Sequence, residues 1–153
     1  MVFYPVEQPS SPVTDDCIFC GLAKNPARVP HRIAESERAL AFLDLHPIRR
    51  GHALVIPKKH ARDLSDVTPQ EMSAVMDLVL QVARLLREKL GSTGENLLVA
   101  SGEGSEQSVY HVHVHVIPRM PYDDLRWNDW WQTKVHFPAM HQLEKLAKSI
   151  REQ

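Results

Sequence analysis

Histidine and valine alternate strictly in one short segment of the chain, YHVHVHVIPR at residues 110–119. Side chains of a β-strand point to opposite faces with a period of two, so the alternation predicts a strand with two different faces. His111, His113 and His115 share one face, whereas the valines between them, whose β-branched side chains suit a pleated surface, occupy the other. The segment therefore predicts a buried valine face and a histidine face that is a candidate functional site.

The histidine face has two interpretations. Neighbouring rings start from Cα atoms about 6.6 Å apart, so adjacent imidazoles can bracket one phosphate or line one polar cavity. The alternative is a solvent-exposed polar face or an adventitious metal-binding tract. Three histidines in register, beside a serine and a tyrosine, favour the functional interpretation.

The most complete helix signal of the chain lies in the middle of the sequence. Thr68 is a suitable N-cap, Pro69 occupies the first helical position, Glu71 completes a capping box, and Gly91 is a suitable stop. Apolar residues recur between them at intervals of three and four, which predicts a helix over 69–90 that lies on a sheet. The apolar stripe is wide, which indicates either deeper burial or a subunit interface.

Four shorter apolar segments, separated by turn residues, are typical of β-strands. Three of them precede the long helix and predict a β-meander, and the fourth leads into the histidine strand. Strands, one long helix and two more strands predict an α+β fold. The four segments are RIAES at 32–36, ALAFLD at 39–44, HALVIPK at 52–58 and ENLLVAS at 95–101.

The length of 153 residues fits one domain whose core needs no disulfide bonds. Residues 1–14 carry three prolines among serines and are expected to form a flexible tail. Residues 15–153 are then expected to form a single domain with a C-terminal extension from about residue 121. In the extension, a polar loop is expected to hold clustered tryptophans, for which local packing is favoured over ligand binding, and a weaker helix is expected from about 139 to 151. The tryptophans are Trp127, Trp130 and Trp131.

The charge of the chain is balanced, with 18 Lys and Arg against 19 Asp and Glu and a formal net charge of -1. No general field for polyanions is implied, so nucleic acid is not an expected partner. The sequence shows no signal-peptide pattern and no stretch of 18 apolar residues. We therefore expect a cytoplasmic protein without a membrane partner.

Cys17 and Cys20 form a C-x-x-C pair, CIFC. Without export signals, such a pair is typical of half a metal site or of a redox dithiol. Redox dithiols follow a strand and open a helix, whereas this pair follows the proline-rich segment, so zinc is favoured. Two further ligands are needed to complete a tetrahedral zinc site.

These segments together resemble one known family. The histidine segment, HVHVHVI, resembles the signature of the histidine triad (HIT) family of nucleotidyl hydrolases and transferases. The segment at 41–60, AFLDLHPIRRGHALVIPKKH, is similar to the upstream motif of the same family. The cysteine pair, CIFC, resembles the N-terminal motif of the zinc-containing bacterial members. The resemblance covers about residues 15–125. It implies a HIT-like fold, with a five-stranded antiparallel sheet, one long helix and a C-terminal helix, and a homodimer formed partly through the long helix.

The resemblance also implies a reaction and the residues that perform it. The activity would be cleavage of a P–N or P–O bond at a nucleotide α-phosphate, in an adenosine phosphoramidate or a diadenosine polyphosphate. His113 would be the nucleophile and would carry a covalent nucleotidyl group, and a neutral imidazole needs no prior deprotonation for this. His115 and His52 would donate hydrogen bonds to the phosphate oxygens. Ser108 matches a position that touches the phosphate or the leaving group, although a hydroxyl satisfied by backbone is an equal alternative.

The same resemblance implies the binding residues. Asp44 would bind the ribose hydroxyls of a purine nucleotide, or alternatively form a turn, and Gln107 would lie beside Ser108 at the substrate. Apolar residues would enclose the purine, although in isolation they are typical of a core: Ile18, Phe19, Leu22, Phe42 and Leu43. No organic cofactor is expected. A structural zinc would be held by Cys17, Cys20, His60 and His111.

The loop before the triad departs from the family pattern at two positions. Ala100 lacks the side-chain amide that would reach the phosphate, and Glu106 replaces a glycine and adds negative charge beside an anionic substrate. These departures sustain an alternative function, a nucleotide-binding zinc-containing dimer with little turnover that acts as a sensor or interaction module.

Overall fold

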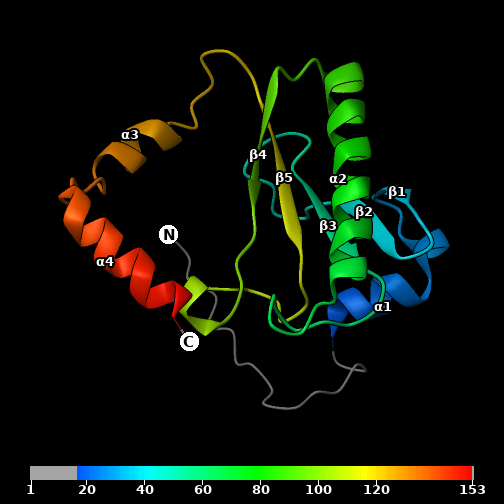
Figure 1. Cartoon of the computed structure of the whole chain (residues 1–153). Coiled ribbons are helices and arrows are strands. Elements are labelled where there is room, and N and C mark those ends of the chain that lie inside the picture. Colours follow the sequence, from blue (N-terminus) through cyan, green and yellow to red (C-terminus); the bar gives the residue numbers. More distant parts are fainter. Residues whose placement is uncertain (1–16, 153) are drawn as a thin grey trace. The chain divides into compact units, whose positions relative to one another are not determined.

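Five antiparallel strands form one sheet in the order β1-β2-β3-β5-β4 in the computed structural model, which describes residues 17–152 (Figure 1). The tail expected over residues 1–14 lies outside the described residues. The chain divides after Pro121 into two compact units. The strands are β1 Arg32–Glu35, β2 Ala39–Leu43, β3 Ala53–Pro57, β4 Gly94–Leu98 and β5 Val114–Arg119. The first unit also holds the helices α1 Ile18–Lys24 and α2 Pro69–Leu90 and the short 3-10 helices η1 Pro26–Arg28 and η2 Glu103–Ser105.

The long helix α2 begins and ends where the sequence predicts. Thr68 Oγ1 accepts the N–H of Glu71 at 3.3 Å, and Glu71 Oε2 accepts the N–H of Thr68 at 3.0 Å. Gly91 closes the helix with φ of 72°, a left-handed conformation that glycine adopts without the Cβ clash of other residues. The capping box and the C-terminal glycine thus fix both ends of α2 locally.

The main core lies between α2 and one face of the sheet. Val114 and Val116 of β5 are almost completely buried and pack with Val79 of α2 in one cluster. The predicted buried valine face is therefore confirmed for β5. Leu80, on the outer side of α2, is 55% exposed, so the helix also carries an apolar side chain that this core does not cover.

A second, smaller cluster occupies the opposite face of the sheet. Alternate residues of β2 and β3 face it, and α1 contributes Phe19, which stacks edge-on against Phe42 with ring centroids 5.6 Å apart. The sheet thus places α1 and its cysteines on the face away from α2. The buried members are Phe19, Val29, Leu40, Phe42, Leu54 and Ile56.

Two of the predicted strands are shorter than expected. The histidine segment pairs with β3 and β4 only from Val114, because the N–H of Val112 donates to Ala61 O at 2.8 Å, outside the sheet. His111 and His113 therefore precede β5 rather than lie within it. The strand expected over 95–101 ends at Leu98, and Ser101 Oγ instead accepts the N–H of Leu64 at 2.9 Å. The other three strands agree with their predictions within one residue.

The second unit contains two helices, α3 Trp127–Gln132 and α4 Met140–Arg151. The polar loop expected around the tryptophans is wrong, because all three lie in α3. The C-terminal helix agrees with the expected 139–151, and Gln142 Oε1 accepts the N–H of Ala139 at 2.9 Å at its start. Across residues 17–152, no helix is long and apolar enough to cross a membrane.

Candidate functional site

The histidines of the candidate site come from segments that the sheet brings together. His52 directly precedes β3, and β3 pairs with β5 so that Leu54 lies opposite His115. His111 and His113 lie in the segment that enters β5, and His60 lies in the loop after β3. The antiparallel pairing of β3 with β5 therefore gathers histidines that are far apart in the sequence.

Cys17 and Cys20 face the same side because they are three residues apart at the start of α1. Cys20 Sγ lies 3.2 Å from His60 Nδ1, and the Sγ atoms of Cys17 and Cys20 lie 3.5 and 3.6 Å from His111 Nδ1. One ligand atom from each of the four residues lies within 4.8 Å of the others. A tetrahedral zinc ion with Zn–S of about 2.3 Å and Zn–N of about 2.0 Å requires ligand separations of about 3.5 Å. The four predicted ligands therefore form a candidate metal centre.

The chemistry of this cluster fits a divalent cation. His111 Nε2 donates to Pro57 O at 2.8 Å, which leaves the lone pair on Nδ1, directed at the thiols. Burial lowers the pKa of His111 to about 4 and raises the pKa of the Cys20 thiol to about 11. The imidazole is thus neutral, as a metal ligand must be, while the buried Cys20 thiol needs a cation to stabilise its thiolate form. The pair does open a helix, as redox dithiols do, but the two histidines at coordination distance favour a metal.

His113 is held with one ring nitrogen available for chemistry. Its Nδ1 donates to His111 O at 2.7 Å, so the lone pair is on Nε2. The ring is 1% exposed, and its centroid lies 5.3 Å from that of Phe19 and 5.0 Å from that of His115. Burial lowers the pKa of His113, so the neutral form predominates at pH 7. A neutral, oriented imidazole of this kind can act as a nucleophile.

His52 and His115 form a directed hydrogen-bond chain. The N–H of Ile48 donates to His52 Nδ1 at 3.3 Å, which places the His52 proton on Nε2. His52 Nε2 donates to His115 Nδ1 at 2.9 Å, which leaves the His115 proton on Nε2. Burial, reinforced by His113 and His52, lowers the pKa of His115 to about 4. The chain therefore presents a neutral N–H donor at His115.

Asp44 lies at the other end of this chain. Its Oδ2 is 3.6 Å from His52 Nδ1, and its Oδ1 accepts the N–H of His46 at 2.9 Å. Asp44, His52 and His115 also bring potential ligand atoms within 4.8 Å of one another. The facing nitrogens of His52 and His115 are already hydrogen bonded to each other, which favours a proton-bearing chain over a second metal centre.

The predicted apolar residues fall into two groups. Phe19, Phe42 and Leu22 belong to the cluster beneath α1, where Phe19 also touches the triad. Ile18 is 64% exposed and Leu43 is 39% exposed. The structure thus places three of the five in a core and two at the surface, and their contact with a purine stays a prediction.

The loop before the triad is held by Gln107. Its Oε1 accepts the N–H of Gly102 at 2.8 Å, and its Nε2 donates to Arg62 O at 2.8 Å and to Val109 O at 2.9 Å. Its neighbour Ser108 is exposed. Glu106 has φ of 58°, a left-handed conformation that glycine would adopt at lower cost. The predicted substrate contacts of Gln107 and Ser108 remain predictions, and the structure assigns Gln107 a structural role that the sequence did not indicate.

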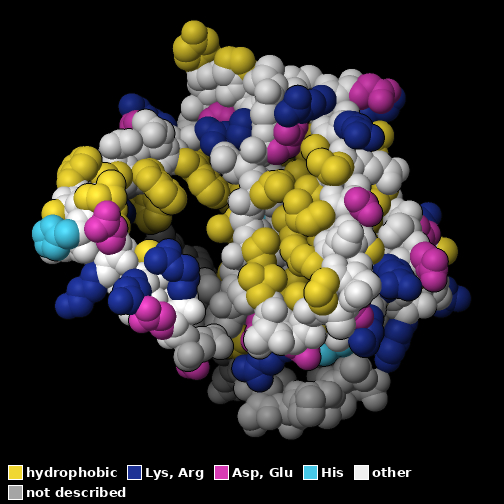
Figure 2. All heavy atoms as spheres, viewed as in Figure 1, with side chains coloured by type: hydrophobic (Ala, Val, Ile, Leu, Met, Phe, Trp, Pro, Cys, Tyr) yellow, Lys and Arg dark blue, Asp and Glu magenta, His cyan; other side chains and the backbone are white. Residues whose placement is uncertain are grey.

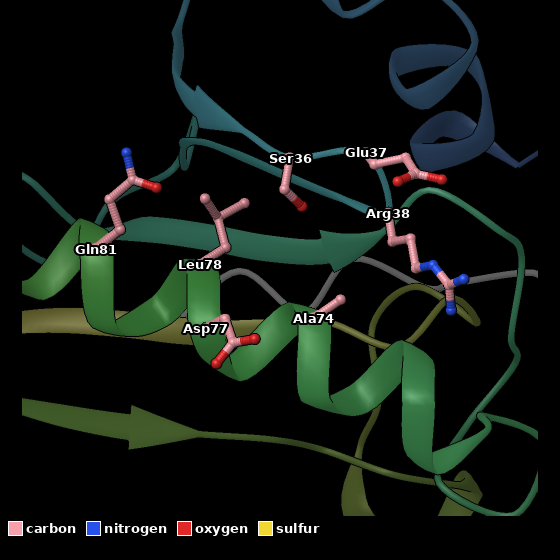
Figure 3. Close-up of a pocket in the computed structure, with 7 residues that line it drawn as sticks. All are labelled: Ser36, Glu37, Arg38, Ala74, Asp77, Leu78 and Gln81. Carbon is pink, nitrogen blue, oxygen red and sulfur yellow. The ribbon is translucent and has the colours of Figure 1, made fainter.

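Backbone groups are the part of the site that sequence reasoning missed. Pro57 O and His111 O select the tautomers of His111 and His113, and the N–H of Ile48 selects that of His52. Backbone atoms leave no residue-type signal, so no motif could have identified them. A separate pocket of about 260 Å³ lies between the β1–β2 turn and α2 and contains none of the histidines (Figure 3).

The sheet places the His113 imidazole beside the hydrogen-bonded pair His52 and His115 and near the cluster of thiols and imidazoles. This arrangement is that of a histidine triad protein. Comparison with known families agrees: the HIT domain family matches residues 26–122, and the chain belongs to this family.

Individual relatives extend the comparison. The chain is 33% identical over 116 residues to the adenylylsulfatase HINT3 of Arabidopsis thaliana, which covers 76% of this chain and 58% of that protein. Among solved structures, a Zn-bound histidine triad family protein from Mycobacterium smegmatis is similar with a TM-score of 0.69 and 37% identity, over 75% of this chain and 83% of the other. A histidine triad nucleotide-binding protein from Candida albicans has a TM-score of 0.73 and 28% identity, over 89% and 95% of the two chains. The zinc-bound relative agrees with the zinc-containing bacterial type.

Proposed function

We propose that the protein is a nucleotide hydrolase or nucleotidyl transferase that cleaves P–N or P–O bonds at a nucleotide α-phosphate. The observation that carries the proposal is the orientation of His113, whose neutral Nε2 lone pair is fixed by the bond from Nδ1 to His111 O. The donor at His115 lies beside it, with the two ring centroids 5.0 Å apart. A nucleophile next to a hydrogen-bond donor is the arrangement that displacement at phosphorus requires.

The reaction proceeds in two displacements. His113 Nε2 attacks the α-phosphorus, and the leaving group departs with the electron pair of its bond to phosphorus, which gives a nucleotidyl-histidine. Water then attacks the same phosphorus and releases the nucleotide and the free imidazole. Each displacement inverts the configuration, so the overall result is retention at phosphorus. The N–H of His115 stabilises charge on the phosphate oxygens, and His52 holds His115 in the donating tautomer.

The substrate class follows from the binding residues and the relatives. The Asp44 carboxylate has lone pairs for two ribose hydroxyls, and of the predicted apolar residues the exposed Ile18 and Leu43 are accessible to a purine. The names of two relatives, an adenylylsulfatase and a nucleotide-binding protein, support an adenylyl group as the part of the substrate that is retained. The departing part is an amine from an adenosine phosphoramidate, or the remaining adenosine polyphosphate from a diadenosine polyphosphate.

A structural zinc ion at Cys17, Cys20, His60 and His111 supports this site. When bound, the ion would hold the His111 side chain in place, and the backbone oxygen of the same residue accepts the hydrogen bond that orients His113. The ion would therefore act as an anchor for the triad. The anchor ties the segment before β5 to α1, whose Phe19 touches the triad.

A homodimer is the proposed assembly. β4 is one edge of the sheet, and its Leu97 and Leu98 are 46% and 45% exposed. Leu80, on the outer side of α2, is also exposed, and Figure 2 shows hydrophobic side chains gathered over this face. An exposed apolar face next to an open strand edge is typical of a subunit interface.

The covalent intermediate provides the test. The protein is mixed with an adenosine phosphoramidate, denatured at alkaline pH to preserve the acid-labile P–N bond, and its intact mass is measured. We expect an adenylyl adduct that His113→Asn abolishes and that His141→Asn, a control at an exposed histidine, leaves unchanged. Nucleotide binding without adduct or turnover would overturn the proposal in favour of a nucleotide-binding module.

A further inference from the structure

We infer that Asp44 has a second role besides ribose binding: it is a positioning residue that acts through His52 to supply the proton that His115 gives to the leaving group. This inference rests on the proposed function and names the proton path of the same site. The observation behind it is that the Asp44 carboxylate, the His52 imidazole and the His115 imidazole lie next to one another in that order.

The three groups are linked through opposite nitrogens of one ring. Asp44 Oδ2 lies 3.6 Å from Nδ1 of His52, and Nε2 of His52 lies 2.9 Å from Nδ1 of His115. His52 is 4% exposed, and the Asp44 side chain is 17% exposed. Bulk water has little access to the His52 ring, so protons pass through these neighbours.

His52 Nδ1 has two competing partners that select different protonation states. The N–H of Ile48, at 3.3 Å, bonds to this nitrogen only when it carries a lone pair, in the neutral ring. The Asp44 carboxylate, at 3.6 Å, bonds to it only when it carries a proton. Both contacts are long, so a small rotation of the ring exchanges one partner for the other. His52 is thus placed between a neutral state and a protonated state.

The proton path balances when it starts from the protonated state. His52 then carries a proton on each nitrogen, and His115 carries its proton on Nε2. The second proton of His52 comes from solvent through the Asp44 carboxylate, whose side chain is 17% exposed. The N–H of His115 first donates to the phosphoryl group. As the leaving atom takes the electron pair of its bond to phosphorus, His115 Nε2 gives it this proton, and His113 Nε2 forms the new bond. His52 Nε2 then gives its proton to His115 Nδ1. His52 ends neutral with its proton on Nδ1, facing Asp44, and no ring becomes an anion.

Asp44 is the group that makes the protonated state accessible. Burial lowers the pKa of His52, and the Asp44 charge raises it. At His115, burial, His113 and His52 all lower the pKa, and Asp44 again opposes them. Besides burial, the groups that shift the pKa values of these two rings are Asp44, His113 and His52. Asp44 also has oxygen lone pairs left for ribose hydroxyls, so the two roles are compatible.

The test compares two substrates that share an adenylyl group and differ in the leaving group. In one, an alkylamine leaves from an adenosine phosphoramidate and must be protonated. In the other, p-nitrophenol leaves from an adenylyl ester as a stable phenolate and needs no proton. For Asp44→Asn we expect KM to rise equally for both, because the ribose contact is shared. We expect kcat to fall about 100-fold for the phosphoramidate, the lower end of a general-acid contribution, and to change little for the ester.

Two variants accompany the comparison. His52→Gln breaks the path but leaves Asp44 in place, so we expect the same loss of kcat on the phosphoramidate with little change in KM. Asp77→Asn, an exposed carboxylate on α2 that lines the pocket of Figure 3, is the matched control and should alter neither substrate. Equal loss of kcat on both substrates in Asp44→Asn or in His52→Gln would overturn the inference. Failure of the wild-type protein to turn over either substrate would instead overturn the proposed function.

Discussion

Replacing Gln107 by methionine should destabilise the loop that leads into the triad. The side chain is 4% exposed and makes three hydrogen bonds of 2.8 to 2.9 Å, to Gly102 N, Arg62 O and Val109 O. Methionine preserves the length of the side chain and removes all three bonds. At about 1 kcal/mol of net stability for each bond, the free energy of unfolding should fall by about 3 kcal/mol. For a chain of this size, that loss lowers Tm by about 6 to 12 °C.

Thermal unfolding followed by circular dichroism measures this shift. Gln70→Met, at an exposed position in the first turn of α2, is the control and should leave Tm unchanged. Unfolding of Gln107→Met at the wild-type temperature would contradict this prediction, because the three bonds would then contribute nothing measurable. A large loss of nucleotide affinity at unchanged Tm would instead support the substrate-binding role that the sequence predicts.

Three further predictions concern the metal, pH and assembly. Elemental analysis of the wild-type protein should find about one zinc ion per chain, and replacing both Cys17 and Cys20 by serine should abolish zinc binding. Zinc retained by the double variant would contradict the proposed ligand set. The folded-state pKa of His115 is about 4, below its unfolded value, so the neutral ring stabilises the fold fully above about pH 6.5. The free energy of unfolding should therefore fall as the pH decreases towards 4. Denaturant midpoints that do not change between pH 7 and 5 would contradict this prediction. If the proposed homodimer forms through the β4 edge, Leu97→Arg should give a monomer in light scattering, whereas a dimer that persists in this variant rules out this surface.

Sequence reasoning succeeded where neighbouring residues supply the signal. Thr68, Glu71 and Gly91 fix the ends of α2 through bonds within a few residues, and the structure agrees with the predicted 69–90. The polar loop around Trp127 was predicted incorrectly, because the polar residues of that segment gave no periodic pattern and the segment is helical. The histidine strand begins late for a different reason: Val112 bonds to Ala61, a residue far away in the sequence.

The candidate site shows the same division. Residue types and a family resemblance predicted the four ligands that the structure brings within 4.8 Å of one another. The direction of each imidazole was not predictable, because it depends on Pro57 O, His111 O and the N–H of Ile48. The approach of Asp44 to His52 was also missed, since it arises from how the turn before β3 folds back.

The sequence by itself determined the period of the histidines, the capped helix and the presence of metal-binding residue types, because these depend on interactions between near neighbours in the chain. Only the tertiary structure decided which nitrogen of each ring carries its proton and which carboxylate faces His52. Those choices are made by hydrogen bonds such as that from His111 to Pro57, 54 residues apart, which exist only once the strands have paired.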